Sequence, residues 1–122
     1  MRNKIKEKLL EIDSTVFYGM VPDNIELKEL NYIVFNSRKL RKKGSSSNDL
    51  SGYWNVAIVR EDYIADELVQ QVIDSLTSLA GLRLADTDFN YEYFTKGGTN
   101  TVVEILVLQF TKMKKGIKSC QQ

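Results

Sequence analysis

The segment that most constrains the fold is residues 101–110, Thr-Val-Val-Glu-Ile-Leu-Val-Leu-Gln-Phe, which is apolar on both of its alternating faces. Successive side chains of a strand point to opposite faces of a sheet, so this pattern predicts a central strand that needs cover on both faces. Residues 89–95 also alternate, and Gly97-Gly98 separates the two segments. The sequence therefore predicts a hairpin around which the rest of the sheet is built.

Residues 63–80 predict an amphipathic helix that covers one face of this sheet. At roughly 100° per residue, the larger apolar side chains fall within one half-turn and the opposite half is polar. Asp62 is placed to cap the start of the helix, and Gly81 is placed to end it.

Three further elements precede this helix. Residues 3–12 carry apolar residues at helical spacing, and residues 30–35 and 53–60 have the β-branched and aromatic alternation of strands. Residues 36–52 are basic and then Ser-rich, which predicts a long loop between these strands.

The predicted fold class is therefore α+β: a four-stranded, mainly antiparallel sheet in the order α-β-β-α-β-β, with the long helix packed on one face and an extended loop between the first two strands. We expect residues 1–113 to form a single domain and residues 114–122 to form a flexible basic and polar tail.

The second face of the predicted sheet lacks an evident cover. Residues 30–35 and 101–110 are apolar on both sides, but the long helix covers only one face. Either the helix over residues 3–12 folds across the far face, or that face is buried between subunits. The sequence leaves both arrangements open.

The composition removes the commonest catalytic and metal-binding groups. The 122 residues include no histidine and a single cysteine, Cys120. The close carboxylates, Glu61-Asp62 and Asp86 with Asp88, are explained as helix-start and turn residues. Gly97-Gly98 lies in a hairpin turn and lacks the strand-to-helix setting of a phosphate-binding loop. We expect no enzyme activity, no catalytic or metal-binding residues and no cofactor.

The sequence also bears on location. No apolar run approaches the roughly 20 residues that a membrane-spanning helix needs. Residues 1–12 set charges among their apolar residues, unlike the uninterrupted apolar block of a signal peptide. We expect no membrane partner and a protein that stays in the cytoplasm or joins an assembly there.

Two groups of residues are candidates for binding. Five positive charges fall within six residues at Arg38, Lys39, Arg41, Lys42 and Lys43. This run is either a solvated loop or a contact for nucleic-acid phosphate or an acidic neighbouring protein. The second group shares one face of a predicted strand and consists of Phe89, Tyr91 and Tyr93. These aromatic residues could stack on bases, although burial in a core or subunit interface is the simpler use.

The order of these segments resembles the tail terminator, or tail-completion and head-to-tail joining, proteins of long-tailed bacteriophages. The resemblance covers about residues 3–113 and includes the run Trp54-x-Val-x-Ile-x-Arg60-Glu-Asp-Tyr63 that leads into the helix. The Ser-rich length of residues 36–52 and the basic tail depart from the family pattern. The resemblance implies a non-enzymatic ring, commonly a hexamer, that caps the tail tube, ends its growth and presents a surface for joining the head.

The implied partners are further copies of the chain, the tail tube protein and a head-completion or connector protein, with genome DNA passing through the channel. The implied location is the head-proximal end of the tail in the virion, after assembly in the host cytoplasm. Two other classes stay open from the residues alone: a small nucleic-acid-binding module that uses residues 38–43, and a small enzyme or ligand-binding domain.

Overall fold

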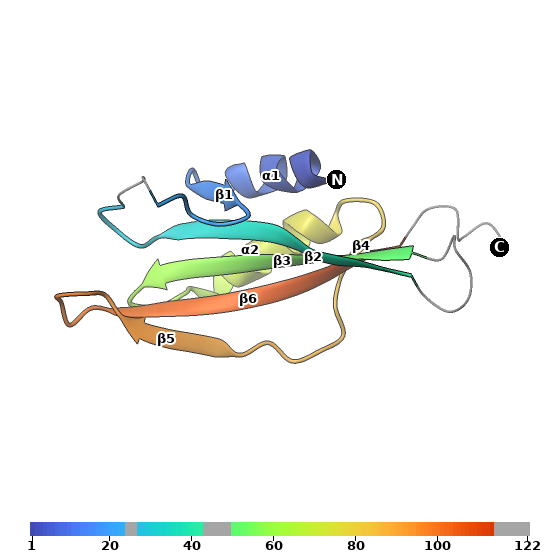
Figure 1. Ribbon diagram of the computed structural model, residues 1–122. Coiled ribbons are helices and arrows are strands. Elements are labelled where there is room, and N and C mark those ends of the chain that lie inside the picture. Colours follow the sequence, from blue (N-terminus) through green and yellow to red (C-terminus); the bar gives the residue numbers. More distant parts are fainter. Residues whose placement is uncertain (24–26, 43–49, 114–122) are drawn as a thin grey trace.

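The computed structural model describes residues 1–23, 27–42 and 50–113, with only the backbone given for 38–42, 50–51 and 113. The elements follow in the order α1 (Arg2–Leu10), β1 (Val16–Tyr18), β2 (Tyr32–Lys42), β3 (Leu50–Glu61), α2 (Asp66–Thr77), β4 (Leu82–Leu84), β5 (Tyr91–Thr95) and β6 (Val102–Met113) (Figure 1). The fold is α+β, and the predicted tail, 114–122, lies outside the described residues.

One six-stranded mixed sheet runs in the order β1-β2-β3-β6-β4, and β5 also pairs with β6. β1 is parallel to β2, whereas the other pairs are antiparallel. The prediction of a four-stranded, mainly antiparallel sheet is therefore wrong. It missed β1 and β4 because each has only three residues, too few to show an alternating pattern, and both form by pairing with a longer neighbour.

The predicted loop over residues 36–52 is also wrong for most of its length. β2 continues to Lys42 and β3 begins at Leu50, so this part of the chain extends the hairpin. The ladder continues through a bulge between Ser37 and Lys39, and β6 runs beside β3 as far as Met113. Backbone pairing holds these polar residues in strands: residues 39–42 pair with β3, and residues 51–52 of β3 pair with both β2 and β6.

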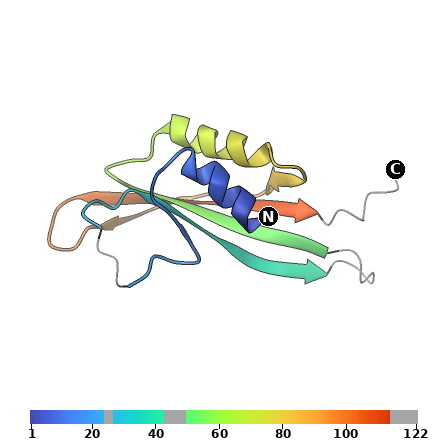
Figure 2. The same cartoon turned by 90° about the horizontal axis from the view of Figure 1, so that it is seen from above.

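Both helices cover the same face of the sheet (Figure 2). Ile5 and Leu9 of α1 and Val72 and Leu76 of α2 belong to one buried cluster. The alternative in which the N-terminal helix crosses the far face is therefore excluded. The fold has two layers, and the second face of the sheet carries neither helix.

The core lies between the helices and this covered face. Its sheet members alternate along β2, β3 and β6, as expected for one side of a pleated sheet. The buried cluster consists of Ile5, Leu9, Ile33, Phe35, Val56, Ile58, Ile64, Val72, Leu76, Leu82, Leu106, Leu108 and Phe110.

The helix predicted over residues 63–80 is shorter than expected, because its first turn is replaced by an irregular link. Asp62 has a positive φ of 74°, a left-handed conformation that Asp tolerates better than most residues, so it forms a turn instead of capping the helix. The N-cap residue is Ala65. At the other end, α2 stops at Thr77 with Ser78 as its C-cap, so the prediction that Gly81 ends the helix is wrong; Gly81, with a φ of 82°, forms the turn that leads into β4.

The packing of α2 predicts a large effect of truncating its buried face. Leu76 is fully buried, so Leu76→Ala is expected to lower the free energy of unfolding by about 2–5 kcal/mol. Urea denaturation followed by circular dichroism measures the change. The control, Gln71→Ala, alters an exposed position of the same helix and should change stability by less than about 0.5 kcal/mol. Equal effects of the two substitutions would contradict the described packing.

Candidate interaction surfaces

The face of the sheet that carries neither helix is apolar at its centre. Val34, Ala57 and Val107 are register partners across β2, β3 and β6, and Ile105 lies two residues before Val107 on the same face. The exposed fraction of Val107 is 41%, which is high for a valine in an inner strand. We name these four residues the open face.

An aromatic pair borders the open face at β1. The rings of Phe17 and Tyr32 make an edge-to-face contact with centroids 5.9 Å apart. Burial raises the pKa of the Tyr32 hydroxyl, since ionisation would place a charge beside apolar neighbours. Two residues farther along the strands, on the same face, lie the polar register partners Asn36, Asn55 and Gln109. The side chain of Asn55 donates a 3.4 Å hydrogen bond to that of Asn36. The apolar surface is thus limited to the middle of the sheet.

An ion pair fixes the connection that leads into β2. The Glu61 carboxylate accepts hydrogen bonds from Lys96 Nζ at 2.8 Å and from the backbone N–H of Leu30 at 2.7 Å. Lys96 Nζ also donates to the carbonyl of Lys28 at 2.6 Å. The hydrogen bonds from Lys96 and Leu30 lower the pKa of Glu61. These contacts tie residues 28–30 to the end of β3 and to the turn between β5 and β6.

A second ion pair fixes the connection between α1 and β1. Arg60 Nη2 lies 2.7 Å from Asp13 Oδ2, and Arg60 Nη1 donates to the carbonyl of Val59 at 2.9 Å. Both side chains of the ion pair are largely buried. Because Asp13 also accepts a hydrogen bond from the N–H of Thr15, it holds the chain just before β1 in place.

Glu104 is a buried carboxylate between α2 and β5. One oxygen accepts a 2.5 Å hydrogen bond from the N–H of Ile64, and the other accepts a 2.7 Å bond from the Tyr93 hydroxyl. The bond to Glu104 raises the pKa of Tyr93. The residues just before α2 are therefore held beside β5, although 29 positions separate Ile64 from Tyr93 along the chain.

The structure separates the two groups of predicted binding residues. The backbone of Arg38, Lys39, Arg41 and Lys42 lies in β2, and Lys43 lies outside the described residues. Phe89 packs against the core, whereas Tyr91 and Tyr93 lie exposed on β5. Because β3 and β6 stand between β2 and β5, the basic run and the aromatic residues do not form one surface.

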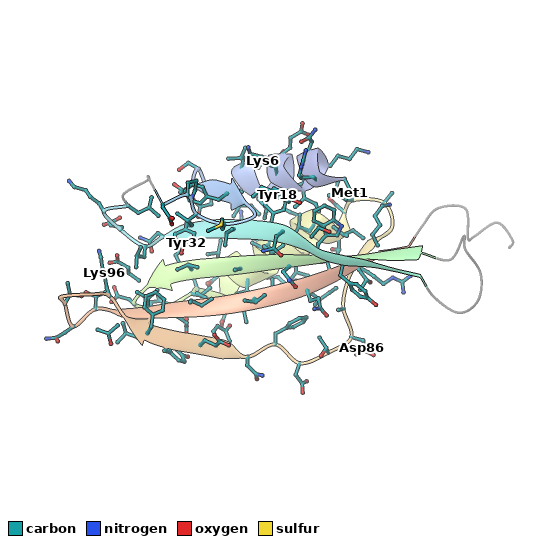
Figure 3. All side chains as sticks on the ribbon, viewed as in Figure 1. Met1, Lys6, Tyr18, Tyr32, Asp86 and Lys96 are labelled. Atoms are coloured by element: carbon teal, nitrogen blue, oxygen red, sulfur yellow. The ribbon has the colours of Figure 1, made fainter. Side chains whose placement is uncertain are left out.

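The carboxylates considered for catalysis are also dispersed. Glu61 is paired with Lys96, and Asp62 forms the turn before α2. Asp86 and Asp88 are exposed in the connection between β4 and β5 (Figure 3). Within 1–23, 27–42 and 50–113, no three His, Cys, Asp or Glu side chains gather where they could hold a metal ion. The described helices also include none long and apolar enough to cross a membrane.

Sequence reasoning considered the basic run at 38–43 as a binding candidate but not the acidic segment 61–95. The signal that identifies this segment is the uneven distribution of charge. Residues 61–95 contain eight acidic residues and one basic residue, whereas residues 1–43 contain ten basic and six acidic residues. The net charge of the whole chain, only +1, conceals this division.

The chain was also compared with known proteins. No protein-family model matches it, and no curated protein matches it.

The Glu61–Lys96 ion pair predicts a pH-dependent contribution to stability. The pKa of Glu61 is lower in the folded chain than in the unfolded chain, so the stabilisation is present above the ordinary carboxyl range and is lost as the pH falls through the folded pKa. Glu61→Gln is therefore expected to lower the urea midpoint at pH 7, with a smaller difference from wild type at pH 3.

Glu92→Gln is the control, since Glu92 is an exposed carboxylate on neighbouring β5. It should leave the urea midpoint nearly unchanged at both pH values. A deficit of Glu61→Gln that stays constant from pH 7 to pH 3 would show that the charge of Glu61 is not what stabilises this corner.

Proposed function

We propose that this chain is a non-enzymatic structural protein of a long-tailed bacteriophage, a tail terminator that forms a ring on the end of the tail tube. In this role it ends tail growth and provides the surface for joining the head. Its partners are further copies of itself in a hexameric ring, the tail tube protein and a head-completion protein, with genome DNA passing through the centre.

The observation that carries the proposal is the open face. Val34, Ala57, Ile105 and Val107 form an apolar surface at the middle of the sheet, and both helices lie on the opposite side. A surface of this kind is typical of a subunit that is completed by a neighbouring protein. The proposal assigns it to the contact with the tail tube or with the head-completion protein.

The family resemblance supplies the assembly in which this neighbour is found. It rests on the strand from Trp54 to Arg60 leading into an acidic and aromatic helix start, followed by a hairpin with a long apolar strand. In the fold these segments are β3, the link to α2, and the pair β5 and β6. They form the sheet that carries the open face, so the resemblance and the surface concern the same part of the molecule.

Disruption of the gene in the phage that encodes the chain tests the proposed function. Electron microscopy of the lysate should show filled heads that lack tails and tails of abnormal length. Expression of the wild-type chain in the host should restore tails of uniform length joined to heads. Virions of normal form from the disrupted phage would overturn the proposal.

A substitution at the open face tests which surface is used. Val107→Lys places a charge at the centre of the apolar surface, and it should prevent complementation because the charge would lose its water in the contact. The side chain is already partly in solvent, so the melting temperature should change little. Val107→Thr keeps the shape of the side chain and should complement better. Full complementation by Val107→Lys would exclude the open face from the contact.

A further inference from the structure

The two outer edges of the sheet differ in charge. α1 carries four basic residues and one acidic residue, whereas residues 61–95, which include α2, β4 and β5, carry one basic and eight acidic residues. β1 and β5 lie at opposite edges of the sheet (Figure 1). The basic helix α1 therefore lies toward the β1 edge, and the acidic residues of β5 and of the connection before it lie toward the opposite edge.

The edge at β1 combines positive charge with exposed apolar groups. Arg2, Lys6 and Leu10 are spaced four residues apart, which places them along one side of α1. The Arg2 guanidinium lies 5.0 Å from the centroid of the Tyr18 ring, so this side of the helix faces β1. Leu10 and Tyr18 are 44% and 41% exposed. We name Arg2, Lys6, Leu10 and Tyr18 the basic edge.

The edge at β5 combines negative charge with exposed aromatic rings. All five residues of β5 are exposed, including Glu92, Tyr93 and Phe94. The bonds to Glu104 hold Ile64 beside this strand, which brings exposed Tyr63 close to it, and exposed Asp66 follows two residues after Ile64. We name Tyr63, Asp66, Glu92, Tyr93 and Phe94 the acidic edge. Exposed Asp86, in the connection that precedes β5, adds a further negative charge on the side of the molecule away from Lys6 and Tyr18 (Figure 3).

Exposed apolar groups are concentrated at these edges. The large hydrophobic residues with high exposure are Leu10, Tyr18, Met20, Tyr63, Tyr91, Tyr93, Phe94, Val102 and Val107. Among these, only Val107 lies at the centre of a sheet face. The others flank β1 or lie at the β5 side, where an edge-to-edge contact would remove them from water.

Both edges also have backbone groups without a neighbouring strand. β1 pairs only with Ile33, Val34 and Phe35, so within the described residues no strand lies beside β2 on that side from Asn36 onward. β5 is paired only with β6. Exposed strand edges readily accept another chain.

We propose that a second copy of this chain docks its basic edge on the acidic edge of the first copy, head to tail. The inference rests on the proposed ring, for which it names the lateral contact between subunits. Each copy keeps one edge of each sign free, so the same contact can repeat from copy to copy until a ring closes. Glu92 and Phe94 lie on the same side of the sheet as Ile105, so the contact borders the open face, and Val34, Ala57 and Val107 stay available for the tail tube or head.

Charge favours this arrangement over a two-fold dimer. A two-fold contact through the acidic edge would bring Glu92 and Asp66 of the two copies close to each other, and one through the basic edge would oppose Arg2 and Lys6. A copy of the chain matches both edges, whereas an unrelated acidic or basic partner matches only one.

Two charge-reversed variants test the contact by sedimentation velocity of the full chain in 50 mM salt. The first, Arg2→Glu with Lys6→Glu, makes both edges acidic. The second, Asp66→Lys with Glu92→Lys, makes both edges basic. Wild type should associate as its concentration rises, and each variant alone should associate on the order of tenfold or more weakly. An equimolar mixture of the variants should recover the association, because acidic and basic copies then alternate.

The control variant, Glu7→Lys with Asp74→Lys, reverses two exposed helix acids outside both edges. It should associate like wild type, and all variants should keep the wild-type melting temperature. Association of both edge variants at wild-type strength, or failure of their mixture to recover it, would overturn the edge contact. A wild-type chain that stays monomeric at every concentration would also overturn the edge contact.

The gene-disruption experiment is independent of these measurements. Normal virions from the disrupted phage would overturn the proposed function, whatever the result for the edge contact.

Discussion

The structure depends on the position of β6. This strand pairs with β3 along one side and with β4 and β5 along the other, so three strands share its hydrogen-bonding groups. Its inward residues, Leu106, Leu108 and Phe110, are buried beneath the helices, whereas Val107 faces away from them. A strand that is apolar on both faces, in a fold with helices on one face, leaves apolar surface exposed. The open face follows directly from this constraint.

The elements that sequence reasoning identified are those whose periodicity extends over many residues. β6 and the amphipathic α2 each bury a regular stripe of side chains, and β5 was identified by its alternation and by the turn at Gly97-Gly98. The missed elements are short or polar. β1 and β4 are stabilised by hydrogen bonds from β2 and β6, and the outer half of the β2–β3 hairpin continues a ladder that began among apolar residues. Their conformation is determined by partners distant in sequence, which a local pattern does not contain.

The candidate surfaces divide in the same way. The second apolar face could be predicted from β6 alone, because alternation assigns each side chain to a face. The two edges could not, since they require knowledge of which strands are outermost. The sequence predicted a long loop around the basic run at 38–43, whereas the backbone of residues 38–42 belongs to β2. The link between Ile64, Glu104 and Tyr93 is likewise tertiary, and it makes the position of α2 dependent on the same strand that presents the acidic edge.

The place of β6 in the chain order has a consequence for biosynthesis. It follows every other described strand in sequence, yet it occupies an inner position in the sheet. While a ribosome is still translating residues 102–113, β3 lacks a partner on one side and the buried cluster that includes α2 lacks Leu106, Leu108 and Phe110. The nascent chain therefore completes its core only after this segment emerges, and until then it exposes unpaired strand edges and apolar side chains. Such intermediates are prone to aggregation, so we expect yield in a host cell to depend on chaperones and on the rate of translation near the end of β6.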